Sequence, residues 1–121
     1  MFKQLLHSIQ TSIFRLLLDE NLPKKLKYRF GDKFEVTTVP DQGWNSLQNG
    51  ELLKAMFDSG IEYLVTADKN MSYQQNYRKW NIKLIVLNTP DNQYEFVLPF
   101  VAKIKELFAE DKIQDYNWIE L

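Results

Sequence analysis

The segment 14–18 most constrains the fold, because it is a short, mostly apolar run (Phe-Arg-Leu-Leu-Leu) that stops abruptly on polar residues. A run of this length indicates a buried β-strand rather than a core helix. Asp19, Glu20 and Asn21 follow it directly, and residues 22–30 then have the pattern of a helix that Asn21 can cap. A strand that leads straight into a helix places the residues between them at the carboxyl end of a sheet, where open α/β folds bind ligands.

The rest of the chain alternates between strand patterns and helix patterns. This alternation predicts right-handed crossovers and a mainly parallel sheet covered on both faces. The expected fold class is therefore α/β, a three-layer α/β/α sandwich whose first four strands take the flavodoxin-like order 2-1-3-4. The expected strands after the first are 34–39, 61–66 and 82–87, with an edge strand within 116–121; the expected helices are 51–57, a short one around 73–79, and a long one capped by Thr89 with Pro90 at its first position.

The length and composition fit a single domain. A chain of 121 residues with 45% hydrophobic content can bury an ordinary globular core. No apolar run approaches the roughly 20 residues that a membrane span requires. The chain has no cysteine, so disulfides and thiolate metal sites are excluded. We expect a cytoplasmic protein with no membrane association.

Residues 1–13 form an N-terminal extension ahead of the expected domain at 14–121. The spacing of their apolar side chains fits one face of a helix. Three interpretations stay open: a helix that docks on its own domain or on the second subunit of a homodimer, a disordered extension, or an upstream start that is not the natural one. The apolar positions are Phe2, Leu5, Leu6, Ile9 and Ile13.

Two of the expected strands end on polar clusters. Asp68, Lys69 and Asn70 follow the strand 61–66, just as Asp19 follows the first strand. In a 2-1-3-4 sheet the first and third strands are neighbours, so Asp19 and Asp68 are expected to lie close together. Glu51 opens the helix that leads into the third strand and is expected on the same side of the sheet. Its alternative role is to complement the dipole of that helix.

Carboxylates gathered in this way repel one another, and a divalent cation is the usual means of relieving the repulsion. Sites rich in oxygen ligands suit Mg²⁺ or Mn²⁺. Such an ion can lower the pKa of a bound water and stabilise charge on a phosphodiester, without histidine or cysteine. The joint placement of three acids therefore indicates metal-dependent chemistry, although each acid alone could be a cap or a solvated loop residue.

Several short motifs occur in order along the chain. Taken together they resemble the compact bacterial PIN-like proteins related to the Mut7-C nuclease domain, and the resemblance covers roughly residues 14–108. Each motif alone is weak, but the ordered set is specific. The motifs are Leu-Leu-Asp-Glu-Asn-Leu-Pro at 17–23, Gly-Trp at 43–44, Asn-Gly-Glu-Leu-Leu at 49–53, Leu-Val-Thr-Ala-Asp-Lys-Asn at 64–70 and Tyr-Gln-Gln-Asn at 73–76.

The resemblance implies a PIN-type sandwich and a ribonuclease that depends on Mg²⁺ or Mn²⁺, often the toxin of a toxin–antitoxin pair. RNA and a small antitoxin protein are then the expected partners. By position, Asp19 corresponds to the first-strand aspartate, Glu51 to the helix glutamate and Asp68 to the third-strand aspartate of the PIN acidic set. These three are the expected catalytic and metal-binding residues, with Glu20 as an accessory metal ligand.

Five further residues are expected to contact the substrate. Asn21 and Asn70 would orient water or phosphate, and Lys69 would neutralise a phosphate oxygen. Tyr73 and Gln74 would line the substrate groove, or alternatively pack the short helix against the sheet. Active PIN nucleases usually carry a fourth acid near the third-strand site, where this chain has Asn70. A catalytically degenerate module that binds RNA or a partner is therefore the alternative function.

A phosphoacceptor receiver also places acids after its first and third strands. Receivers normally add a lysine, followed by proline, after a late strand. No Lys-Pro pair occurs in this chain, and Glu51 would have no role in a receiver. The receiver interpretation is therefore disfavoured.

Overall fold

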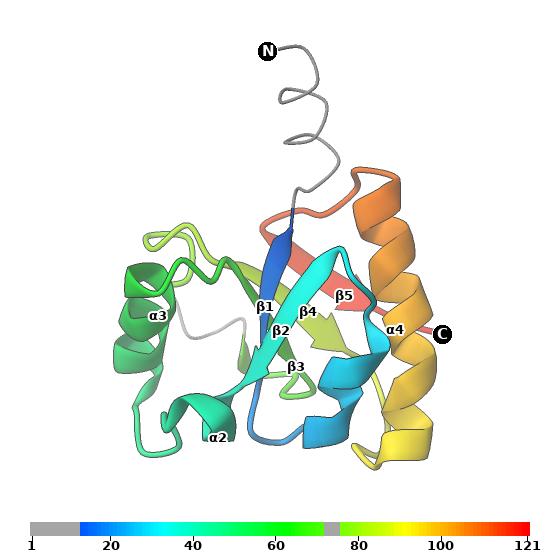
Figure 1. The fold of residues 1–121 in the computed structure, drawn as a ribbon, viewed down its shortest axis with the longest axis horizontal. Coiled ribbons are helices and arrows are strands. Elements are labelled where there is room, and N and C mark those ends of the chain that lie inside the picture. Colours follow the sequence, from blue (N-terminus) through cyan, green and yellow to red (C-terminus); the bar gives the residue numbers. More distant parts are fainter. Residues whose placement is uncertain (1–12, 72–75) are drawn as a thin grey trace.

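Five parallel strands form the centre of the molecule, in the order β2-β1-β3-β4-β5 (Figure 1). The computed structural model describes residues 13–71 and 76–121. Its sheet confirms the α/β class and the predicted 2-1-3-4 order, and the expected edge strand is added beside β4. The strands are β1 (Phe14–Leu18), β2 (Phe34–Thr38), β3 (Tyr63–Thr66), β4 (Lys83–Leu87) and β5 (Tyr116–Ile119).

Both faces of the sheet are covered, because side chains alternate along each strand. Leu16 and Leu18 of β1 join one buried core, whereas Leu17 joins the other. The first core is closed by the 3₁₀ helix η1 and the long helix α4, and the second by α2 and α3. The helices are η1 (Lys24–Arg29), α2 (Val39–Gln42), α3 (Asn49–Asp58) and α4 (Tyr94–Ala109).

The helix expected at 22–30 is shorter and tighter than predicted. It is a 3₁₀ helix that begins at Lys24, and the Leu26 amide donates to Pro23 O at 3.1 Å across a single tight turn. The preceding residue, Pro23, forms no side-chain cap. The prediction that Asn21 caps this helix is therefore wrong, because the helix starts two residues too late for its side chain to serve.

The long final helix also starts later than predicted. Thr89 and Pro90 were expected to cap and open it, but α4 begins at Tyr94 after Gln93. The Thr89 hydroxyl instead accepts a hydrogen bond from the Asp91 amide at 3.3 Å, which holds a local turn. Pro99 lies inside this helix.

Other boundaries moved by a few residues. The strand expected to run through Val39 ends at Thr38, whose hydroxyl accepts from the Asp41 amide at 3.0 Å and caps the short helix α2. The described part of the chain contains no helix with the length and apolar character of a membrane span. Residues 1–12 and 72–75 lie outside the described residues. The short helix expected around 73–79 is not borne out in its described part, because residues 76–79 form turns.

Candidate functional site

The carboxyl ends of β1 and β3 bring two acids together. Leu18 pairs with Val65 in the parallel register, and the Asp19 amide donates to Val65 O at 2.9 Å. Asp19 therefore leaves the sheet directly beside Thr66, the last residue of β3. The neighbouring strands predicted from the sequence are confirmed.

Thr66 connects the two acidic loops. Its hydroxyl donates to Asp19 Oδ2 at 2.7 Å and accepts from the Asp68 amide at 3.0 Å. Thr66 is completely buried, so this hydroxyl has no water to replace either partner. The arrangement fixes the Asp19 carboxylate relative to the backbone that carries Asp68.

The loop that carries Asp68 is held by its own side chain. Asp68 Oδ1 accepts from the Asn70 amide at 2.9 Å, and Asp68 O accepts from the Met71 amide at 3.1 Å. This is the hydrogen-bonding pattern of an Asx turn. It leaves the other oxygen of the Asp68 carboxylate, Oδ2, without a hydrogen-bond donor among the described residues.

Asp19 lies in an environment that opposes its charge. Burial raises the pKa of the Asp19 carboxyl above its ordinary value of 3.8, although the hydrogen bonds from Thr66 and the Glu20 amide lower it in part. The negative charges of Glu20 and Asp68 raise this pKa further. A positive charge at this point would reverse the effect, which is the electrostatic condition for a cation site.

Glu20 and Asn21 extend the same edge of the sheet. Glu20 is exposed, and its Oε2 lies 3.5 Å from Asn45 Nδ2 in the loop that follows α2. The backbone oxygen of Asn21 accepts from Asn92 Nδ2 at 2.6 Å. The side-chain oxygen of Asn21 is buried and has no hydrogen-bond partner within residues 13–71 and 76–121. A buried oxygen without a donor carries a cost and calls for an explanation.

Glu51 is engaged by its own helix. Its Oε1 accepts from the Gln48 amide at 2.9 Å, and the two residues form a capping box at the start of α3. Among residues 13–71 and 76–121, no three acidic or histidine side chains are grouped closely enough to hold one metal ion. The structure therefore brings together two of the three expected carboxylates, and a ligand role for Glu51 stays a prediction.

The expected substrate contacts divide into three cases. Lys69 reaches across to the end of β4, where its Nζ donates to Thr89 O at 3.0 Å. Asn70 is exposed at the rim. Tyr73 and Gln74 lie outside the described residues, so their role in a groove stays a prediction.

Protein-family models, curated proteins and solved structures give no match to this chain. Any functional assignment therefore rests on its own residues.

The edge of the sheet that carries Asp19 and Asp68 is called the acidic edge below. Sequence reasoning missed the residues that hold its loops in place. Thr66, Thr89 and Asn92 each connect segments that are distant in sequence. A signal for Thr66 was present, since it is the polar residue that ends an otherwise apolar strand two positions before Asp68. No comparable pattern marks Asn92.

Cations and aromatic rings adjoin this edge on η1 and the start of α4. Lys25 Nζ lies 4.2 Å from the centre of the Tyr94 ring, and Arg29 Nε donates to Tyr94 Oη at 2.6 Å. Tyr28 is 75% exposed beside them. Both elements lie at the same end of the sheet as the carboxyl end of β1 (Figure 1). This surface has the composition that binds single-stranded nucleic acid elsewhere.

Proposed function

We propose that this chain is a metal-dependent endoribonuclease that hydrolyses RNA phosphodiester bonds, with Asp19 and Asp68 as its central acids. The observation that carries the proposal is the buried Thr66 hydroxyl that joins the Asp19 carboxylate to the Asp68 backbone. Two acids held close together at a sheet edge, one with a raised pKa, destabilise the fold, so stability alone does not explain their placement. A PIN-like version of the α/β fold belongs to the same proposal.

The residues at this edge fit Mg²⁺ or Mn²⁺. All the candidate ligands are oxygens, and Mg²⁺ is usually bound by one or two carboxylates together with water and substrate phosphates. Asp19 and Asp68 would hold the ion, with Glu20 as an accessory ligand. The buried side-chain oxygen of Asn21, which has no hydrogen-bond partner among the described residues, supports the binding of a polar ligand near this position. When bound, the ion would supply an activated water and charge stabilisation for a phosphodiester.

The other residues of the edge would bind and orient the RNA. Thr66 keeps the Asp19 carboxylate in one orientation. Lys69 would neutralise a phosphate oxygen, for which it would exchange its contact with Thr89 O. The exposed ring of Tyr28 would stack on a base, with the neighbouring cations of η1 along the backbone.

A specific observation favours the second candidate, a degenerate PIN-like module that binds RNA or a protein partner without cleavage. Asn70 stands where a fourth acid is expected, and its backbone amide donates to the Asp68 carboxylate. Glu51 is occupied as a helix cap. A site with two acids in place of four would bind a cation more weakly than an active nuclease does.

The cellular role that we propose is that of a cytoplasmic toxin restrained by a small antitoxin protein. The resemblance described above supports it, together with a basic, aromatic surface next to the acids. A homodimer in which the N-terminal extension contacts a second subunit is part of the same proposal.

Cleavage of a fluorophore-labelled single-stranded RNA tests the function. We expect cleavage with Mn²⁺ or Mg²⁺, none with EDTA, and none by Asp19→Asn or Asp68→Asn. The matched control is Asp111→Asn, which removes an exposed carboxylate at a position with a φ of 55° that asparagine tolerates. Cleavage that survives both Asp19→Asn and Asp68→Asn would refute the assignment. RNA binding without cleavage would favour the degenerate module.

A further inference from the structure

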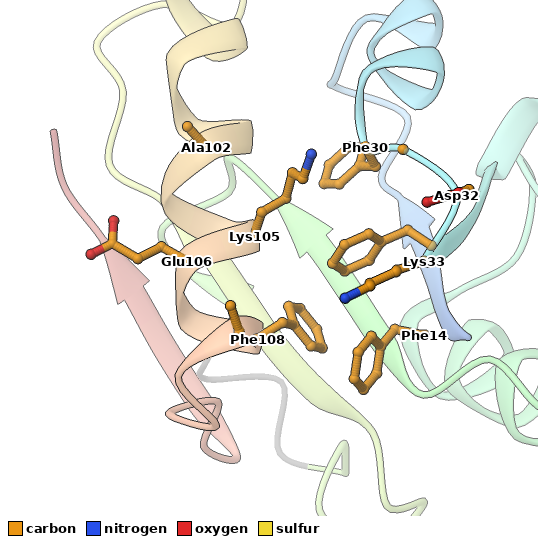
Figure 2. A pocket seen from close by; sticks show the side chains of 11 residues that line it. Phe14, Phe30, Asp32, Lys33, Ala102, Lys105, Glu106 and Phe108 are labelled. Carbon is orange, nitrogen blue, oxygen red and sulfur yellow. The ribbon is translucent and has the colours of Figure 1, made fainter. Parts of the chain in front are cut away.

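A second candidate site lies at the opposite end of the sheet. There a cavity of about 660 Å³ opens between α4 and the first residues of β1 and β2 (Figure 2). Phe14 and Phe34 begin these two strands, whereas Asp19 and Asp68 follow the ends of β1 and β3. The cavity is therefore separate from the acidic edge. Its walls include Phe14, Phe30, Phe34, Phe108, Lys33 and Lys105.

The floor of the cavity is a cluster of aromatic rings. The ring centres of Phe14 and Phe108 are 4.5 Å apart, and those of Phe34 and Phe108 are 5.1 Å apart in an edge-on arrangement. All three rings are only half-buried, unlike Phe30, which is 1% exposed. Aromatic rings pack favourably against one another in edge-on and offset arrangements. Because these three rings line the cavity, they offer aromatic surface to a flat ligand.

Two lysines supply positive charge at this cavity. Figure 2 shows the side chains of Lys33 and Lys105 extending into the space between α4 and the two strands, whereas Glu106 points away on the far side of α4. Among the described residues, neither lysine forms an ion pair. Lys105 Nζ lies 3.5 Å from the position that a Cβ on Gly31 would take. Asp32 and Glu106 are the acidic residues that line the cavity, and the Glu106 carboxylate lies on the far side of α4 (Figure 2).

We propose that this cavity binds a small aromatic carboxylate. The flat apolar body would complete the ring cluster of Phe14, Phe34 and Phe108, and the carboxylate would lie between Lys33 and Lys105. The volume of about 660 Å³ falls within the range of roughly 300–1,000 Å³ that is typical of small-molecule sites. Both lysines are exposed, so each adds a modest charge attraction that favours an anion over a neutral ligand.

Calorimetric titration of the full chain with 2-naphthoate tests the proposal, with the uncharged 2-naphthamide as the matched ligand. We expect naphthoate to bind several-fold more tightly than naphthamide. Lys33→Gln and Lys105→Gln should each weaken naphthoate binding about two- to fivefold, the effect of one exposed ion pair. Lys103→Gln, an exposed position on the same helix that does not line the cavity, should leave binding unchanged.

A second variant fills the space without touching the core. Ala102 is exposed on α4 and lines the cavity, so Ala102→Trp should fold normally and abolish naphthoate binding. Equal binding of the two ligands, or binding that neither the lysine variants nor Ala102→Trp alters, would overturn the proposal. Failure of the wild-type chain to bind naphthoate would also overturn it. If the wild type fails but the full-length Leu5→Asp/Leu6→Asp variant binds, the occupant of the cavity is the chain's own N-terminal segment rather than a small molecule. Because the titration contains no RNA, its outcome is independent of the nuclease proposal.

Discussion

The hydroxyl of Thr66 lies 2.7 Å from Asp19 Oδ2, to which it donates a hydrogen bond. The same hydroxyl accepts from the Asp68 amide, so one buried group determines the separation of the two acidic loops. Thr66 contributes no charge of its own. Its part is to position a carboxylate whose ionisation the surroundings oppose.

Replacement of Thr66 by valine should destabilise the fold. Thr66→Val keeps the shape but leaves the part-buried Asp68 amide without its acceptor, and the loss of such a hydrogen bond typically costs about 1–3 kcal/mol. Urea unfolding at pH 7 measures the loss. Thr66→Ser, which keeps the hydroxyl, should lose much less. Equal stability of the valine and serine variants would show that the bridge is not formed in solution.

Replacement of Asp19 by asparagine should stabilise the metal-free protein at neutral pH. Burial raises the pKa of Asp19 above 3.8, so the folded state holds the proton more tightly than the unfolded chain does. Ionisation therefore costs stability as the pH rises from 3.8 through the folded pKa, and the cost is complete once the pH is well above the folded pKa. Asp19→Asn escapes it and should melt a few degrees higher.

The pH dependence of that gain is its control. The advantage of Asp19→Asn should disappear below pH 3.8, where the carboxyl is protonated in both states. Thermal melts between pH 3 and pH 7 with EDTA present would test this, with Asp111→Asn for comparison. A lower melting temperature than wild type at pH 7 would contradict it.

The ion pair between Lys27 and Asp41 shifts the pKa of Asp41 downward, opposite to the shift of Asp19, and so should change stability with pH in the opposite direction. The hydrogen bond from Lys27 lowers the pKa of Asp41 from 3.8 to about 2, with a smaller contribution from Lys24 at 3.2 Å. A lowered pKa stabilises the fold above pH 3.8, and this contribution is lost as the pH falls towards 2. Lys27→Gln should raise the pKa of Asp41 in a carboxyl NMR titration. Lys103→Gln should not, and an unchanged titration in Lys27→Gln would count against the pair.

The sheet was predictable in detail, whereas the helix starts were not. Apolar runs such as 82–87 reveal buried strands by composition alone, and alternation with helices then implies the parallel order. Helix starts depend on which donor finds which acceptor. Thr89 and Asn21 both have side chains suited to capping, but Thr89 holds a turn with Asp91, and the helix after Asn21 begins too late.

Of the acidic edge, only the part that follows from the order of the strands could be predicted. Asp19 and Asp68 follow neighbouring strands, so topology alone brings them together. Glu51 lies on a helix, and its side chain accepts a hydrogen bond from the Gln48 amide instead of joining Asp19 and Asp68 in one group among the described residues. The aromatic cavity was not foreseen, because it is formed where the start of β1 meets the end of α4, which are far apart in sequence.

Substitutions at Glu51 separate its two roles. The capping box requires an acceptor but no charge, so Glu51→Gln should keep the stability of wild type within about 0.5 kcal/mol. Glu51→Ala should lose about 0.5–2 kcal/mol. Urea unfolding measures both changes.

Calorimetry with Mn²⁺ then tests the ligand role of Glu51. Because Glu51 Oε1 accepts from the Gln48 amide and no third acid joins a group among the described residues, we expect Glu51→Gln to bind Mn²⁺ with nearly the affinity of wild type. A loss as large as that caused by Asp19→Asn would instead place Glu51 among the ligands.

The acidic edge also carries a consequence for folding kinetics. Asp19 and Thr66 are separated by 47 residues, and their strands pair in parallel, so no local hairpin can bring them together. The intervening β2, α2 and α3 must first fold back across the sheet, and non-local closures of this kind are slow steps. In a chain leaving the ribosome, β1 and β2 emerge first, so Asp19 can meet Asp68 only after β3 has been added to the sheet.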